Sequence, residues 1–242
     1  MLLANQIALV TGGGRGIGEA IAVKFAAEGA AVVLTGRNEA ALAETRDAIR
    51  AGGGTADMFA ADLTVDSQVD ELITYTLKLH GRIDILVNNA GISKEMPLVD
   101  MPMSVWDDIM NINLRGVVLC TKAALPGMIA RKSGNIINIA SASAIRGLPG
   151  STAYSASKAA VVSLGQALGD ELRPHGIRVN NICPGPVDTE LFKQSERREF
   201  ILKAGGDVFE PETIASSALY LASDMSKGVS SQTMVIRGFN RW

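Results

Sequence analysis

The chain has 242 residues, of which 47% are hydrophobic and 20% are charged, and its formal net charge is −2. This composition is typical of a globular protein, and the charge favours neither nucleic acid nor an anionic membrane surface as a partner. Two cysteines, Cys120 and Cys183, are too few for a disulfide framework or a zinc site, so no metal is expected. The chain start lacks signal-peptide features, and charge or glycine breaks every apolar run within about a dozen residues, so we expect a cytoplasmic protein without a membrane span.

Short apolar segments alternate with longer amphipathic segments along the chain. Strands are predicted at residues 6–11, 30–35, 55–60, 83–88, 135–140, 177–183 and, more weakly, 233–236. Helices are predicted at residues 16–28, 39–51, 66–80, 104–131, 153–173 and 211–222. Several strands are continuously apolar, which is typical of parallel strands buried on both faces. The alternation predicts an α/β fold, a Rossmann-type doubly wound parallel sheet of about seven strands with helices on both faces.

No repeat, low-complexity segment or linker divides the chain, so residues 1–242 are expected to form a single domain. The least regular stretch is 184–210, which is charged and has no clear core face. In a compact fold such a segment is more often a functional loop than a linker, so we expect a short substrate loop around 186–210. Open parallel sheets bind ligands beyond the carboxyl ends of their strands, and functional residues are expected there.

A glycine-rich loop follows the first predicted strand. It leads into an amphipathic helix and reads Thr11-Gly12-Gly-Gly-Arg15-Gly16-Ile17-Gly18. Glycines allow a tight turn and close backbone approach, and the helix N-terminus presents N–H groups and a positive dipole to an anion. The spacing differs from the G-x-G-x-x-G fingerprint and from a Walker A loop, in which a lysine would replace Glu19. We interpret the loop as a phosphate cradle.

The second predicted strand ends beside Arg37. A site selective for NAD places an acidic residue here to hold the ribose 2′-hydroxyl, but the first acid in this segment is Glu39. Arg37, helped by Arg15, is suited instead to a 2′-phosphate. We therefore predict NADP(H) as the cofactor. NAD is the alternative, in which Arg37 is a solvated loop cation.

Two further strand ends complete the predicted nucleotide site. Asp62 and Leu63 follow the third strand, where the carboxylate could accept a hydrogen bond from the adenine amino group. Asn89, Ala90 and Gly91 follow the fourth strand and offer a turn against which the nicotinamide half could lie. Each short motif is weak alone, and its weight comes from its position at a predicted strand end.

Tyr154 and Lys158 lie four residues apart at the start of the helix predicted at 153–173. Side chains at i and i+4 share one helix face. A free phenol has a pKa near ~10, so bringing it near neutrality requires about 3 units, or ~4 kcal/mol. An ammonium ~4.5 Å away at an effective dielectric of ~20 would supply ~3.7 kcal/mol. We predict that Lys158 makes Tyr154 an acid/base, although such a pair alone also fits an exposed helix surface.

A serine at the end of the fifth predicted strand strengthens this interpretation. Ser141 lies 13 residues before Tyr154, at the same edge of the sheet, and can hydrogen-bond a substrate carbonyl. Ser143 is the competing candidate. Serine-nucleophile chemistry is disfavoured because neither His80 nor His175 lies at a predicted strand end and no G-x-S-x-G elbow is present.

In this order and spacing, the motifs resemble those of the short-chain dehydrogenase/reductase family in its single-domain form. The resemblance covers nearly the whole chain and rests on Thr11-Gly12-xxx-Gly16-x-Gly18, Asp62, Asn88-Asn89-Ala90-Gly91, Ser141, Tyr154-xxx-Lys158 and Pro184-Gly185. It implies an NAD(P)-dependent oxidoreductase acting on a carbonyl or secondary alcohol. The short region between Pro186 and Pro211 is similar to that of 3-oxoacyl-(acyl-carrier-protein) reductases, with a reductase or alcohol dehydrogenase for an unrelated small ketone as the alternative. A non-catalytic dinucleotide-binding protein is a further, weaker alternative.

The resemblance also implies a role for each catalytic residue. Tyr154 is the general acid/base, Lys158 binds the nicotinamide ribose and lowers the tyrosine pKa, and Ser141 orients the substrate oxygen. Asn113, rather than the nearby Asn111, holds a water in a proton relay.

The last segments of the chain carry the remaining implications. By resemblance, the loop after the sixth strand covers the nicotinamide, and its residues Pro184, Gly185, Val187 and Thr189 contact the cofactor. The resemblance implies a homotetramer or homodimer. The family commonly ends in an aspartate and paired glycines, whereas this chain reads Ile-Arg-Gly-Phe-Asn-Arg-Trp over 236–242, so subunit contacts of the tail are less well defined.

Overall fold

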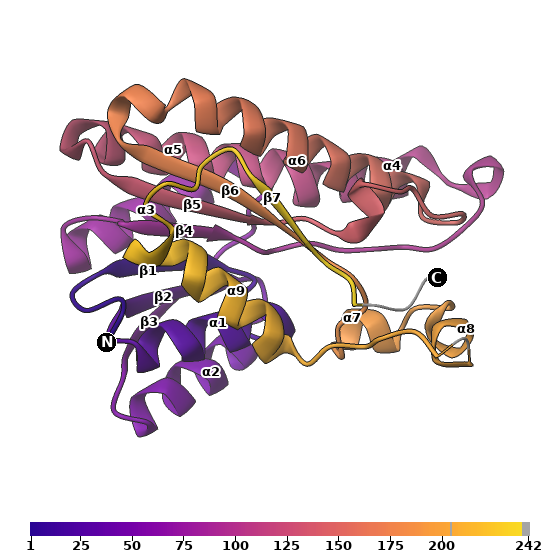
Figure 1. Ribbon diagram of the computed structural model, residues 1–242, viewed down its shortest axis with the longest axis horizontal. Coiled ribbons are helices and arrows are strands. Elements are labelled where there is room, and N and C mark those ends of the chain that lie inside the picture. Colours follow the sequence, from indigo (N-terminus) through magenta and orange to yellow (C-terminus); the bar gives the residue numbers. More distant parts are fainter. Residues whose placement is uncertain (204, 239–242) are drawn as a thin grey trace.

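A parallel sheet forms the centre of the protein. The computed structural model describes residues 1–203 and 205–238, and within them seven parallel strands lie in the order β3-β2-β1-β4-β5-β6-β7 (Figure 1). The strands are β1 Ile7–Thr11, β2 Ala31–Gly36, β3 Thr55–Ala60, β4 Ile85–Asn88, β5 Gly134–Ile139, β6 Ile177–Pro184 and β7 Thr233–Ile236. The predicted doubly wound parallel sheet is confirmed, and where the ends of its strands differ from the predictions they do so by one or two residues.

Helices cover both faces of this sheet. They are α1 Gly16–Ala27, α2 Glu39–Ala51, α3 Asp66–His80, α4 Met103–Met110, α5 Gly116–Arg131, α6 Thr152–Glu171, α7 Glu190–Lys193, α8 Arg198–Lys203 and α9 Pro211–Ala222. Helices α1, α2 and α9 share one core cluster on one face, and α3 and α5 share another on the opposite face, where α6 also lies (Figure 1). The short helices α7 and α8 lie within the stretch that was predicted to be irregular.

The continuous apolar sequence of β1 follows from this layering. Ala8 and Val10 point into the core beneath α1, whereas Leu9 points into the opposite core beneath α3 and α5. Successive side chains of a strand alternate between the two faces, so a strand covered on both sides needs apolar residues at every position. Full burial of a side chain such as Leu9 contributes about 1.5–3 kcal/mol.

The helix predicted at 104–131 has a more complex form. Helices α4 and α5 are joined without a break by a π-helical turn, Asn111–Arg115. The resulting helix, Met103–Arg131, is long and apolar enough to cross a membrane by length and composition alone, so the expectation that no segment would meet this criterion is wrong here. Cys120 and Met128 of this helix are buried in the core cluster against the sheet, and a core helix meets the same criterion.

The strand order places a crevice at the carboxyl edge of the sheet. The chain proceeds from β1 outward to β3 and then returns to β4 on the other side of β1. Loops leaving β1 and β4 therefore diverge, and such a switch point is where open α/β sheets bind ligands. The glycine loop after β1 and the segments after β4, β5 and β6 all meet at this edge.

Candidate active site

The glycine loop after β1 has the conformation that a phosphate cradle requires. Gly12 and Gly16 have φ angles of +65° and +58°, a region in which side chains with a Cβ are strained. A Cβ on Gly18 would lie 2.2 Å from the carbonyl oxygen of Gly12, so only glycine lets the first turn of α1 pack against the loop. Gly16 and Ile17 of this turn line the groove, and a helix N-terminus offers N–H groups to an anion.

Thr11 fixes the glycine loop to the turn after β4. Its hydroxyl donates to the carbonyl of Val87 at 3.2 Å and accepts from the backbone N–H groups of Asn89 and Ala90 at 2.9 and 3.0 Å. The Asn89 amide in turn donates to the carbonyls of Thr11 and Gly12 at 3.0 and 3.2 Å. These contacts cross-link β1 to β4, and the buried Thr11 side chain does not line the pocket.

The ends of β2 and β3 form the wall expected to hold the adenosine. Arg15, Arg37 and Asp62 all line the pocket there. The Asp62 carboxylate accepts hydrogen bonds from the Thr64 backbone N–H at 2.9 Å and the Thr64 hydroxyl at 2.8 Å. The N–H bond is the main cause that lowers the pKa of Asp62, and the Arg37 guanidinium lowers it further. No acidic side chain follows β2 before Glu39.

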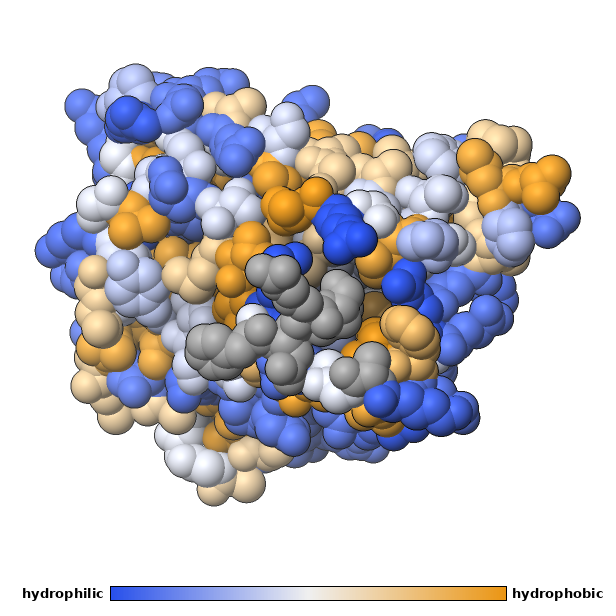
Figure 2. All heavy atoms as spheres, turned by 45° about the vertical axis from the view of Figure 1, so that its right-hand side comes forward, coloured by the Kyte–Doolittle hydropathy of each residue, from blue (hydrophilic) through white to orange (hydrophobic). Residues whose placement is uncertain are grey.

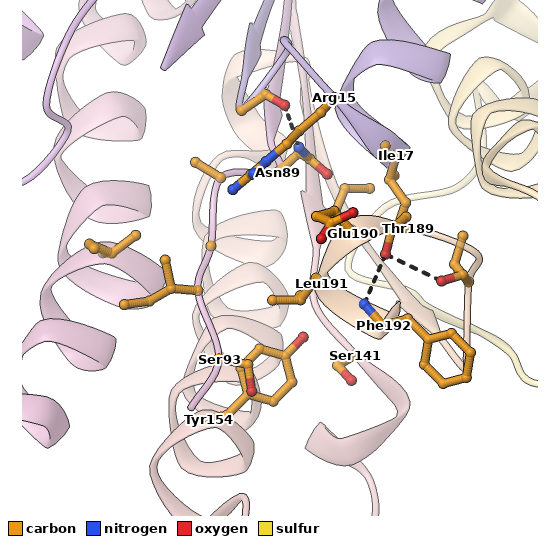
Figure 3. A pocket seen from close by; sticks show the side chains of 18 of the residues that line it. Arg15, Ile17, Asn89, Ser93, Ser141, Tyr154, Thr189, Glu190, Leu191 and Phe192 are labelled. Atoms are coloured by element: carbon orange, nitrogen blue, oxygen red, sulfur yellow. Dashed lines mark hydrogen bonds between the residues drawn. The ribbon is translucent and has the colours of Figure 1, made fainter. Parts of the chain in front are cut away.

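Ser141 and Tyr154 face each other beyond the end of β5. The Ser141 hydroxyl accepts hydrogen bonds from the Ser143 hydroxyl at 2.9 Å and the Ser143 backbone N–H at 3.2 Å, and its influence on the Tyr154 phenol lowers the pKa of that group. Figure 3 shows Tyr154 and Ser141 on opposite sides of the same opening, with Ser93 beside the tyrosine ring. Ser143 therefore supports Ser141, which is the serine that influences the tyrosine pKa.

Lys158 lies beneath this pair on α6. Its ammonium donates to the carbonyl of Ile139 at 2.9 Å and lies 5.8 Å from the Tyr154 ring centroid. A Cβ on Gly91 would lie 3.3 Å from the Lys158 nitrogen, so the turn after β4 closes over the lysine. The lysine is only 4% exposed, and burial lowers its pKa to about 8.

The pKa of Tyr154 differs from the expectation based on charge alone. Burial raises it, and Ser141 lowers it only in part. The Lys158 ammonium was expected to lower the pKa of Tyr154. Burial, however, disfavours both the phenolate of Tyr154 and the ammonium of Lys158. The ammonium is also directed at the Ile139 carbonyl. The tyrosine is therefore a neutral phenol near pH 7, the form that can give a proton to a carbonyl oxygen.

Asn113 belongs to the π-helical turn between α4 and α5. Its side-chain oxygen accepts from the Ile92 N–H at 2.8 Å, and its amide donates to the Ile92 carbonyl at 2.9 Å and the Ser157 hydroxyl at 3.1 Å. The side chain is buried and fully used in holding the segment after Gly91 against α6. Asn113 does not line the pocket, and its predicted role in a water relay stays a prediction.

A single groove of about 470 Å³ joins these parts. The sequence-predicted residues that line it are Gly12, Arg15, Gly16, Ile17, Arg37, Asp62, Leu63, Asn89, Ala90, Gly91, Ser141, Tyr154, Lys158, Pro184, Gly185, Val187 and Thr189. Thr11, Gly18 and Asn113 do not line the groove and instead pack against the segments that do. Figure 2 shows this side of the molecule, where apolar and strongly hydrophilic side chains lie next to one another around the middle.

Sequence reasoning named none of the individual residues in the far wall of the groove, although part of this wall falls within the substrate loop predicted around 186–210. This wall is formed by polar and apolar residues of two segments, Ser93, Glu95, Leu191, Phe192, Gln194 and Ser195. In Figure 3, Leu191 of α7 lies between Glu190 and the Tyr154 ring. These residues match no chemical motif, and the only sequence signal was the irregular composition of 184–210.

The groove fits a dinucleotide. The conformations of Gly12 and Gly16 leave room at α1 for a pyrophosphate, and Asp62 with Arg37 offers an acceptor and a cation at the adenosine end. Lys158 and the Asn89–Gly91 turn lie at the other end, where a nicotinamide riboside would meet Tyr154. The fold and the site together define a nicotinamide-dependent oxidoreductase of the Rossmann type.

Comparisons with known proteins show the family. The sequence profile described as short chain dehydrogenase matches residues 6–199, and the chain belongs to the short-chain dehydrogenase/reductase family, whose members use NAD(P) to act on alcohol or carbonyl groups. The 3-oxoacyl-[acyl-carrier-protein] reductase of Thermotoga maritima is 36% identical, and the match covers 98% of each chain. The (2S)-[(R)-hydroxy(phenyl)methyl]succinyl-CoA dehydrogenase subunit BbsD of Thauera aromatica is 37% identical over 98% of this chain and 97% of its own. The crystal structure of levodione reductase superposes with a TM-score of 0.92 at 33% identity, covering 98% of this chain and 97% of the other.

Proposed function

We propose that the protein is an NADP(H)-dependent reductase that converts a small ketone to a secondary alcohol. The observation that carries the proposal is that Ser141, Tyr154 and Lys158 line the same end of the groove, with the Lys158 ammonium 5.8 Å from the Tyr154 ring centroid. Arg37 and Arg15 at the other end support NADP(H), because these cations, with no acid directly at the end of β2, suit a 2′-phosphate. NAD is the alternative cofactor.

The side chains can perform the proton half of this reaction. Ser141 and Tyr154 would hold the substrate carbonyl oxygen by two hydrogen bonds, which stabilise the negative charge that develops on it. The reduced nicotinamide, when bound, supplies the hydride that adds to the carbonyl carbon. Tyr154 gives its proton to the oxygen, so that C=O becomes CH–OH and a phenolate remains. The Lys158 ammonium, charged below a pKa of about 8, stabilises that phenolate.

A 3-oxoacyl thioester is the first candidate substrate. Support comes from the 3-oxoacyl-[acyl-carrier-protein] reductase of T. maritima and from the CoA-linked dehydrogenase subunit of T. aromatica, both similar over nearly their whole length. The alternative is an NAD-dependent alcohol dehydrogenase for an unrelated small substrate. A non-catalytic dinucleotide-binding protein is disfavoured because such a protein has no use for Tyr154, Ser141 and Lys158 in one groove.

Three broader expectations accompany this proposal. We propose that residues 1–242 act as a single dinucleotide-binding domain in which the segment around 186–210 is the substrate loop. We also propose a cytoplasmic homotetramer or homodimer, supported by membership of a family whose enzymes commonly form oligomers. Residues 239–242 lie outside the described residues, so the contribution of the unusual tail to subunit contacts stays a prediction.

Cofactor titration and a turnover assay test the proposal. The purified protein is titrated with NADPH and NADH, and oxidation of each is followed with S-acetoacetyl-N-acetylcysteamine and a panel of simple ketones. Tyr154→Phe is expected to bind NADPH as the wild type does while losing at least ~10²-fold in kcat, the low end for a lost acid/base. Near-normal turnover by this variant would refute the acid/base role, and binding of neither cofactor would refute the proposal as a whole.

A further inference from the structure

The far wall of the groove is closed by a contact between two distant segments. The Ser195 hydroxyl, just after α7, donates to the Glu95 carboxylate at 2.6 Å across 100 residues of sequence. Glu95 belongs to the segment after β4, and both residues are half-buried and line the groove. Because a single serine hydroxyl satisfies only part of a carboxylate, which can accept several hydrogen bonds, Glu95 keeps accepting capacity for a ligand.

Further hydrogen bonds hold Glu95 in this position. The Met96 N–H donates to the carbonyl of Gly150 at 2.8 Å, and the Arg197 guanidinium donates to the carbonyl of Pro149 at 3.3 Å. The Ser195 hydroxyl also accepts from the Arg197 N–H at 3.2 Å. The segments around 95, 150 and 196 are thus tied together, so the carboxylate is held at the wall.

The charges along the groove are unevenly distributed. The cations that line it are Arg15 and Arg37 at the adenosine end and Lys158, which is directed at the Ile139 carbonyl. The substrate end carries serine hydroxyls, an amide, apolar side chains and the carboxylates of Glu95 and Glu190, of which Glu190 accepts a hydrogen bond from the Gln194 amide at 2.8 Å. Within residues 1–203 and 205–238 no ion pair neutralises Glu95.

From this arrangement we propose that Glu95 is a specificity-determining residue that rejects ketones with a carboxylate near the reacting carbonyl and accepts neutral or cationic ones. The inference rests on the proposed reductase function. A substrate carboxylate at this wall would approach a fixed like charge in a partly desolvated groove, which is unfavourable in both the bound and the transition state. A neutral ester, amide or thioester meets no such repulsion, and a cationic group gains attraction.

Substrates that share the acetoacetyl group but differ in charge test the proposal. With NADPH, kcat/KM is measured for acetoacetate, ethyl acetoacetate and acetoacetylcholine, with wild type and Glu95→Gln. Glutamine keeps an oxygen that can accept from Ser195 but removes the charge. We expect Glu95→Gln to raise kcat/KM for acetoacetate about tenfold, to change that for ethyl acetoacetate less than about threefold, and to lower that for acetoacetylcholine.

Two control variants separate charge from structure. Glu199→Gln removes the same charge from the exposed surface of α8, outside the groove, and is expected to leave all three kcat/KM values within about twofold of wild type. Ser195→Ala breaks the contact but keeps the Glu95 charge, so the discrimination against acetoacetate is expected to persist. The charge argument would be overturned if Ser195→Ala lost the discrimination against acetoacetate while Glu95→Gln kept it.

The failure of this inference differs from the failure of the proposed function. Suppose that wild type reduces ethyl acetoacetate but Glu95→Gln leaves unchanged the ratio of kcat/KM for acetoacetate to kcat/KM for ethyl acetoacetate. Glu95 then does not select substrates by charge. If wild type reduces none of the ketones in the whole panel, the reductase function itself is wrong and Glu95 has no substrate to select.

Discussion

Replacing Lys158 by methionine should stabilise the fold while removing activity. The lysine is 4% exposed, and burial lowers its pKa from 10.5 to about 8. A shift of roughly 2.5 units corresponds to about 3.4 kcal/mol that the buried charge costs the native state at pH 7. Methionine has a similar length but cannot donate to the Ile139 carbonyl, and this lost hydrogen bond costs about 1 kcal/mol. The net gain is about 2 kcal/mol, or roughly 4–8 °C in Tm for a protein of this size.

The pH dependence gives the sign of this effect. Between pH 8 and 10.5 the unfolded wild type binds more protons at Lys158 than the native state, so wild-type stability rises with pH across this window. The advantage of Lys158→Met should therefore be largest below pH 8 and shrink as pH approaches 10.5. Urea unfolding at pH 7 and pH 9.5 measures the difference in unfolding free energy between Lys158→Met and wild type at each pH. The matched control is Lys122→Met at an exposed position, which is expected to change stability by less than about 0.5 kcal/mol. A variant that is less stable than wild type at pH 7, or a gap that does not shrink with pH, would refute the reasoning.

Two further predictions concern the nucleotide end. Arg37→Asp should lower the preference for NADPH over NADH by about 10–100-fold, because it removes a charged hydrogen-bond donor and adds an acceptor for a ribose hydroxyl; an unchanged ratio of the two dissociation constants would exclude Arg37 from the site. Gly18→Ala should destabilise the protein by about 1–3 kcal/mol and weaken cofactor binding, because its Cβ would meet the Gly12 carbonyl at 2.2 Å. Gly228→Ala, with open space around it, is the control for chemical denaturation and cofactor titration, and equal behaviour of the two variants would contradict the packing argument.

The local parts of this protein could be predicted from sequence. Continuous apolar segments indicated parallel strands covered on both faces, and the alternation with helices indicated the doubly wound sheet. The glycine loop and the pair Tyr154 and Lys158 could also be predicted, because turn chemistry and helical spacing act over a few residues. Parallel strands then bring their carboxyl ends to one edge, so residues such as Asp62 and Ser141 could be assigned to a common site before any contact was known.

What only the tertiary structure decided depends on contacts between distant segments and on burial. The sequence did not show that Thr11 holds the turn after β4, or that the Asn113 side chain hydrogen-bonds the backbone of Ile92. In both cases the partner lies far away in the chain. Charge alone predicted a lowered tyrosine pKa, whereas burial raises it, and burial is a property of the folded chain. The pairing of Glu95 with Ser195 has no local signal at all, since a glutamate in one loop and a serine in another become a wall of the groove only when the sheet brings them together.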